Sequence, residues 1–198
     1  MLEGSFFNNS DVFWYYNKLI LRRQLQGHDL LVCCLDTGSN YDTFSIALLH
    51  DYYESKQGEP GHVELGSCRI MSMIDNLTPE INNYKGHFKD SSGINVTGVL
   101  AKHIEESKIK INSGKFSFRT RVVNKITFNH HGIMPYEKYN GRLDAIVVSS
   151  MTTGYKTLLK KHASFLLRSK GVIFVCEMNE DIDIQGMKHI RPGVYIHE

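Results

Sequence analysis

The sequence is poor in the residues that mark several large classes of protein. Its 198 residues include four cysteines, four prolines and one tryptophan. No two cysteines form a C-x-x-C pair, which excludes the usual zinc-binding and dithiol redox motifs. Cys33, Cys34 and Cys176 instead lie in apolar runs, as small buried hydrophobic residues of cytosolic proteins do.

Long apolar runs and an excess of one charge sign are also missing. No uncharged apolar stretch approaches the roughly 20 residues that a membrane-spanning helix requires. The first 16 residues lack the basic and apolar regions of a secretory signal. A net charge of +2 argues against a dedicated nucleic-acid-binding protein, which normally carries a concentrated basic stripe. We therefore expect a cytoplasmic protein that binds neither membrane nor nucleic acid.

The segments that are present predict a single α/β domain over residues 1–198, with a mostly parallel sheet and flanking helices. Hydrophobic residues make up 41% of the chain, which is ordinary for a well-buried globular core. Periodicity does not decide whether residues 43–56 form a helix or a strand. The other early elements that we expect are a helix over 11–26, strands over 29–35 and 69–74, a helix capped by Asn95 over 96–108, and a half-exposed strand over 116–129.

The final third of the chain is its most regular part. An apolar strand over 143–150, an amphipathic helix over 153–170 ended by Gly171, and an apolar strand over 172–178 follow one another. A strand, a crossover helix and a second buried strand form a right-handed parallel unit. The core residues predicted for this unit are Leu143, Ile146, Val148, Phe165, Leu166, Ile173 and Val175.

The strand predicted over residues 29–35 runs directly into Asp36-Thr37-Gly38-Ser39. One lobe of an aspartic protease presents its catalytic carboxylate in this way, but the chemistry needs two carboxylates that share a proton. The turn occurs once here, and the small dimeric enzymes that repeat it by pairing are short all-β chains. We interpret Asp36 as a residue that hydrogen-bonds the turn after a buried strand. A protease that uses Asp36 is kept as a remote hypothesis.

Few other residues suggest catalytic or metal chemistry. The adjacent pair His130-His131 points to opposite sides of an extended backbone and has no further ligand at suitable spacing. Asp144 and Glu177 begin one strand and end the next, so they cannot form a carboxylate dyad. The hydroxyl residues between Ser149 and Thr153 lie where open α/β sheets bind ligands, but hydroxyls alone specify no reaction. The sequence therefore predicts no catalytic, cofactor-binding or metal-binding residue.

In residues 139–178, Asp144 opens a strand, Ser150 closes it, and Gly171 precedes the next strand after the intervening helix. This segment resembles the later half of the class I methyltransferase fold. The resemblance implies a methyltransferase-like, Rossmann-like sheet. The Gly-rich turn with which such enzymes hold S-adenosylmethionine has no counterpart, because Gly38 is the lone glycine after the strand at 29–35. No tight binding of that cofactor is expected.

Three further places carry a second resemblance, in the same order along the chain: DVFWYYNKL at 11–19, NVTGVL at 95–100, and FSF at 116–118 followed by YNGRLD at 139–144. They are similar to motifs in the C-terminal region of the dynein axonemal assembly factor three family. That family's W-G-D-I segment has no counterpart between residues 60 and 95. The resemblance implies a non-enzymatic protein without a cofactor, which acts through protein contacts in the assembly of ciliary dynein or the axoneme, in the cytoplasm or the cilium.

Aromatic and apolar residues that the core cannot absorb would then mark the partner interface. The candidates are Trp14, Tyr15, Met134, Pro135 and Tyr136. Packing of Trp14 inside the core is the alternative. The competing function is an S-adenosylmethionine-dependent methyltransferase with an atypical cofactor site between Ser149 and Thr153.

Overall fold

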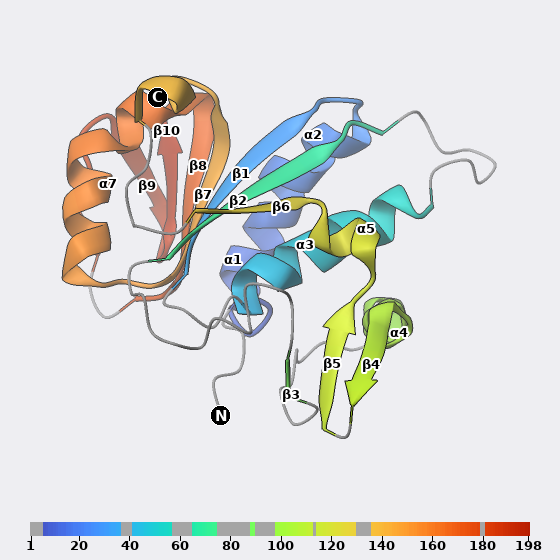
Figure 1. Cartoon of the computed structure of the whole chain (residues 1–198). Helices are drawn as coiled ribbons and strands as arrows, with labels where there is room; N and C mark the ends of the chain where they lie inside the picture. Colours follow the sequence, from blue (N-terminus) through green and yellow to red (C-terminus); the bar gives the residue numbers. More distant parts are fainter. Residues whose placement is uncertain are drawn as a thin grey trace.

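The computed structural model of the chain shows one mixed sheet, flanked by helices, and a small second sheet (Figure 1). The prediction of an α/β chain with a mostly parallel sheet is confirmed. The structure describes residues 6–36, 41–56, 65–74, 88–89, 98–112, 114–129, 136–178 and 181–198.

The main sheet has seven strands in the order β6-β2-β1-β7-β8-β10-β9. The first five in this order are parallel, whereas β10 runs antiparallel to both β8 and β9. Their bounds are β1 (Leu30–Asp36), β2 (Cys68–Ile74), β6 (Ile126–Asn129), β7 (Leu143–Ser150), β8 (Leu167–Glu177), β9 (Met187–Arg191) and β10 (Val194–His197).

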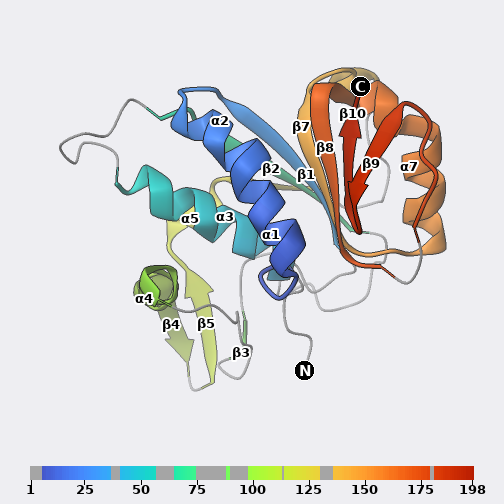
Figure 2. The same cartoon turned by 180° about the vertical axis from the view of Figure 1, so that it is seen from behind.

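The central strands form because nearly every residue in them is apolar and is buried on one face or the other. In β1, Val32 and Cys34 point toward one apolar cluster, while Cys33 and Leu35 point toward the other. The first cluster is covered by the N-terminal helix, made of α1 (Ser10–Tyr16), η1 (Asn17–Leu21) and α2 (Arg22–Leu25), together with α3 (Tyr41–Glu54). Figures 1 and 2 show these helices on one side of the sheet and α7 (Thr153–Leu166) on the other.

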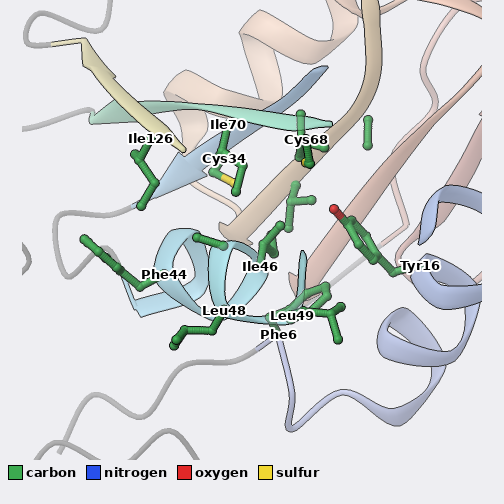
Figure 3. Packing of buried hydrophobic residues seen from close by; sticks show 14 of the residues in the cluster. Phe6, Tyr16, Cys34, Phe44, Ile46, Leu48, Leu49, Cys68, Ile70 and Ile126 are labelled. Atoms are coloured by element: carbon green, nitrogen blue, oxygen red, sulfur yellow. The ribbon is translucent and has the colours of Figure 1, made fainter. Parts of the chain in front are cut away.

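The residues 43–56, whose structure periodicity left open, lie almost wholly in helix α3. Ten consecutive residues of this helix, from Asp42 to Asp51, are buried, so its sequence shows no polar face. In Figure 3, Ile46 points from α3 toward the strands, Leu49 lies next to Phe6, and Tyr16 approaches from the N-terminal helix.

The N-terminal helix contains a π-helical turn at η1. Four of its five buried residues, Val12, Tyr16, Ile20 and Gln24, are spaced by four, and the fifth is Leu21. A regular α-helix, with about 3.6 residues per turn, would rotate this series steadily away from the sheet. The wider π turn, which is often found at functional sites, cancels that rotation and keeps all four on one face.

The predicted unit at 143–178 is present, with two corrections. Helix α7 ends at Leu166 and not at residue 170, because Leu167 is already extended and Lys170 adopts a left-handed φ of 62°. Phe165 was predicted as core, which is wrong: its side chain is 43% exposed, since it lies off the face that buries Leu159, Ala163 and Leu166. The other core predictions are confirmed for Leu143, Ile146, Val148, Leu166, Ile173 and Val175.

The single strand predicted over residues 116–129 is also wrong. The segment forms β5 (Lys115–Phe118), a helical turn α5 (Thr120–Val123) and β6, which belong to two different sheets. The amide of Asn124 donates to the carbonyl of Thr120 at 2.8 Å, so the alternation of apolar residues is broken by a turn of helix.

The second sheet has the order β3-β5-β4, with β3 (Phe88–Lys89) and β4 (Lys108–Asn112). Helix α4 (Gly98–Ser107) lies between β3 and β4 in the chain; it is the predicted helix, and its expected cap Asn95 lies outside the described residues. A short helix α6 (Tyr136–Tyr139) precedes β7. Within the described part of the chain, no helix has the length and apolar character needed to cross a membrane.

Candidate functional site

The winding of the main sheet reverses between β1 and β7. These strands are neighbours, with Val32 opposite Ala145 and Leu35 opposite Val148. The chain leaves β1 through α3 toward β2, and leaves β7 through α7 toward β8, on the opposite side. In open α/β sheets, ligands bind beyond the carboxyl ends of the two strands at such a reversal. The carboxyl ends of β1 and β7 are therefore where the fold would hold a ligand.

The described side chains at this position are hydroxyls. Ser149 is buried and Ser150 is half-buried at the end of β7. Thr152 caps α7, because its Oγ1 accepts the backbone N–H of Tyr155 at 3.2 Å. The side chain of Asp36 and the whole of residues 37–40 lie outside the described residues, so the role of that turn stays a prediction.

The two carboxylates considered in the final third of the chain, Asp144 and Glu177, lie at opposite ends of the neighbouring strands β7 and β8. Glu177 is the register partner of Ser150, at the carboxyl edge. Asp144 stands at the start of β7, at the amino edge. They do not form a dyad, as the sequence predicts.

Asp144 is instead a buried structural node. Its Oδ2 accepts the backbone N–H of Leu31 at 2.9 Å, and its Oδ1 lies 3.5 Å from Nη1 of Arg23 and forms an ion pair with Arg168. Burial raises the pKa of the Asp144 carboxyl, against the opposing effect of the Leu31 N–H and the two guanidinium groups. The node joins α2, β1, β7 and β8 far from the carboxyl edge.

A second polar cluster lies inside the apolar core. His50 stands between Tyr16, whose hydroxyl is 2.8 Å from Nε2, and Gln24, whose Oε1 is 2.6 Å from Nδ1. The Gln24 amide donates to Glu54 at 2.8 Å, and Lys125 pairs with the same carboxylate. Because Gln24 Oε1 can only accept, Nδ1 carries the proton and Nε2 accepts from the tyrosine.

This chain of hydrogen bonds requires a neutral imidazole. Burial, together with the positive charge of Lys125, lowers the pKa of His50 to about 3. Sequence reasoning missed the cluster, although Gln24 and His50 interrupt otherwise apolar helix faces. Their partners are distant in the sequence, so only the polar interruptions were visible.

A third cluster has the residue types of a catalytic triad but not its geometry. Asp51 Oδ2 lies 3.0 Å from Nε2 of His103 and 3.0 Å from Nε of Arg121. Ser107 is one helical turn after His103, yet its Oγ is fully buried and has no hydrogen-bond partner among the described residues. A hydroxyl that is neither activated nor accessible cannot act as a nucleophile. The cluster joins α3 to α4 and α5.

Trp14 lies on the surface, so the alternative in which it packs inside the core is wrong. Its side chain is 54% exposed. The ring meets Tyr15 edge to face at 4.6 Å, and Nζ of Lys18 lies 4.6 Å from its centroid. Of the other interface candidates, Met134 and Pro135 lie outside the described residues, as does the side chain of Tyr136, whose backbone begins α6. The interface itself stays a prediction.

An open cavity of about 370 Å³ lies beyond the end of β8, beside the start of α1. Asn9 shapes it by donating from Nδ2 to the carbonyl of Cys176 at 2.9 Å. The described lining brings together amide, hydroxyl and carboxylate groups but no acid–base pair. It consists of Asn8, Asn9, Ser10, Cys176 and Glu177. Across the parts of the chain that the structure describes, no three His, Cys, Asp or Glu side chains are grouped so that they could hold a metal ion. The pair His130-His131 lies outside those parts.

Comparison of the chain with models of known protein families and with curated protein sequences finds no match.

Removal of the Asp144 carboxylate should destabilise the fold strongly. In Asp144→Ala, the two arginines lose their shared counter-charge and the Leu31 N–H loses its acceptor. We expect the free energy of unfolding, measured by urea denaturation, to fall by about 3 kcal/mol. Asp183→Ala removes an exposed carboxylate and should change it by less than about 0.5 kcal/mol. Equal effects of the two substitutions would contradict the claim that the contacts of Asp144 stabilise the fold.

The buried His50 should make stability depend on pH. Its pKa is about 3 in the folded chain, whereas about 6.5 is normal for an exposed histidine. Below about pH 6.5 the unfolded chain therefore binds a proton that the folded chain does not, so stability falls as the pH is lowered toward 3.

Between about pH 7 and pH 5 the contribution of His50 should be a loss of about 2 kcal/mol. We expect His50→Gln to lack this part of the pH dependence in denaturation curves. The matched variant His28→Gln, which changes an exposed histidine, should retain it. A pH dependence that is the same in both variants would show that His50 titrates normally.

Proposed function

We propose that the chain is a non-enzymatic binding protein, related to the axonemal dynein assembly factors, that acts through protein–protein contacts in the assembly of ciliary dynein or the axoneme. The observation that carries the proposal is the exposure of Trp14 on a helix whose opposite face is firmly buried. Residues 11–19, which carry the first part of the resemblance to the assembly factors, include this tryptophan.

The strand order supports a methyltransferase-like fold. Numbered by their sequence in the main sheet alone, its strands have the order 3-2-1-4-5-7-6. The first five positions follow the doubly wound order of dinucleotide-binding proteins. An antiparallel last strand inserted between the fifth and sixth is the arrangement of the class I methyltransferases, which residues 139–178 resemble.

The sequence after β1 argues against a working cofactor site in this fold. A nucleoside cofactor needs backbone to approach closely at the first turn, and successive glycines permit this. Residues 37–40 supply Gly38 alone. A methyltransferase with an atypical site between Ser149 and Thr153 is the second candidate, and the position of these residues beside the reversal of winding favours it.

The surface around Trp14 has the properties of a binding site for a protein. Val12 and Tyr16 fix the helix on the core, while Tyr15 and Lys18 both contact the indole ring. A partner would therefore bind an aromatic anchor that loses little conformational entropy. Tryptophan and tyrosine of this kind contribute much of the binding energy at protein interfaces.

Substitution of Trp14 should separate binding from stability. Because half of the side chain is exposed, Trp14→Ala should lower the melting temperature by no more than about 3 °C. We expect the purified variant to recover at least about tenfold less axonemal dynein from a ciliated-cell extract, measured by immunoblot, because loss of a hot-spot side chain costs about 2 kcal/mol. The matched control is Phe165→Ala, which removes another exposed aromatic ring, from α7. Equal recovery of dynein by the two variants would show that Trp14 is not part of the partner-binding surface.

Titration with S-adenosylmethionine distinguishes the two candidate functions. We expect no measurable heat of binding in calorimetry at cofactor concentrations up to about 1 mM, since at that limit the binding free energy is only about −4 kcal/mol. A micromolar dissociation constant that is weakened in Ser150→Ala would instead establish the atypical methyltransferase site.

A further inference from the structure

The small sheet is attached to the rest of the molecule by aromatic rings on one of its faces. Phe88 of β3 and Phe118 of β5 lie 5.0 and 5.5 Å from the ring of Phe44 on α3, and Phe116 stacks on Phe88 at 5.6 Å. Figures 1 and 2 show this sheet and α4 beside α3, away from β7 and β8. Residues 109–112 of β4 are exposed.

Charge of one sign gathers in this part of the chain. Residues 107–136 contain six of the 23 lysines and arginines and none of the 21 aspartates and glutamates. Three of the six pair with acids elsewhere: Arg121 with Asp51, Lys125 with Glu54, and Lys108 with Glu105. The remaining three are exposed and form no ion pair with any described residue: Lys110, Lys115 and Arg119. The net charge of +2 hides this local excess.

The outer edge of β4 carries backbone groups that do not pair with β5. The N–H of Arg119 donates to the carbonyl of Ser107 at 2.9 Å. Hydrogen bonding alternates along an antiparallel ladder, so the N–H and C=O of Lys110 point away from β5. β4 is the outermost strand of its sheet, and within the described residues no strand pairs with it on the outer side.

The side chains of β4 limit what can pair with that edge. Lys108 and Lys110 alternate with Ile109 and Ile111, whose side chains are 47% and 43% exposed. Lysines on an edge strand discourage pairing with a copy of itself, because like charges would face one another across the new ladder. The same pattern is complementary to a strand in which acidic and apolar residues alternate.

We propose that the open edge of β4 binds an extended acidic segment of another protein as an added strand. Its carboxylates would lie opposite Lys108 and Lys110, and its apolar residues beside Ile109 and Ile111. Backbone hydrogen bonds supply affinity in such strand addition, and alternate side chains supply specificity. The proposal does not rest on the proposed function, since it uses neither Trp14 nor the ends of β1 and β7.

Two other occupants fit less well. Single-stranded nucleic acid binds where exposed aromatic rings stack on bases, but Phe88, Phe116 and Phe118 are all buried. The chain itself has an acidic–apolar alternation at 181–184, yet Ile182 and Ile184 are buried in the second apolar cluster. A segment of a different protein therefore fits the edge best.

The test uses the full chain and a fluorescein-labelled nonapeptide of alternating glutamate and valine, with binding followed by fluorescence anisotropy. We expect saturable binding that weakens about tenfold in Lys110→Glu, since an attractive cross-strand pair becomes a repulsive one. Lys161→Glu, the same substitution on an exposed position of α7, should bind as the unchanged chain does. Absence of saturable binding, or equal loss in both variants, would overturn the proposal.

A second pair of measurements separates strand addition from simple attraction of charge. Lys110→Gln removes the charge and keeps the outward N–H, whereas Lys110→Pro removes both without removing a ladder hydrogen bond. Lys110→Pro should therefore weaken binding several-fold more than Lys110→Gln, while its melting temperature stays close to that of the unchanged chain. A peptide with its glutamates and valines in separate blocks should bind several-fold more weakly than the alternating one. Equal binding of the two peptides, or tighter binding of an oligouridylate, would overturn the assignment of the edge to an acidic strand.

Discussion

The hydrogen-bond chain from Tyr16 through His50 and Gln24 to Glu54 fixes how the N-terminal helix lies on the core. Each group in it is matched to a neighbour, and inside an apolar core an unmatched one would be costly. Apolar packing alone would tolerate sliding of α1 along α3, whereas this chain of polar contacts is satisfied in a single arrangement. Lys125 extends the same restraint to the segment that leads into β6. The exposed position of Trp14 follows from it.

The fold could be predicted from the sequence where a strand is buried on both of its faces. The central parts of β1, β7 and β8 (residues 30–35, 145–148 and 172–176) are apolar throughout because both of their faces are covered, and composition alone identifies such strands. Helix α3 was left open for the same reason: buried all round, it has no polar face to reveal its period. The C-terminal pair of β9 and β10 was not foreseen, since its charged and polar residues resemble a loop.

Predictions from local sequence patterns were wrong where the structure of a segment depends on contacts with residues far away in the sequence. Alternation over 116–129 predicts one strand, but Arg121 and Lys125 reach Asp51 and Glu54 on α3, and the chain turns between them. Phe165 was misplaced because the sequence does not show which apolar residues of α7 face the sheet: Leu159, Ala163 and Leu166 do, and Phe165 lies off that face. Of the candidate site, the sequence could suggest Trp14 only as a flanking residue. The hydrogen bonds of His50 could not be predicted, because its partners Gln24 and Tyr16 are 26 and 34 residues away in the sequence.

The two ends of the chain meet in the finished structure. Asn9 holds the carbonyl of Cys176, 167 residues later, and a Cβ atom at Gly193 would lie 3.5 Å from Val12. During synthesis, the N-terminal helix therefore leaves the ribosome long before β8 and the following hairpin, on which it packs. Until they arrive, Val12, Tyr16 and Ile20 have no complete core to cover them. Domains dominated by such long-range contacts fold slowly and expose apolar surface in the interval. A nascent chain of this protein therefore exposes part of its apolar helix surface until β8 and β10 have been synthesised.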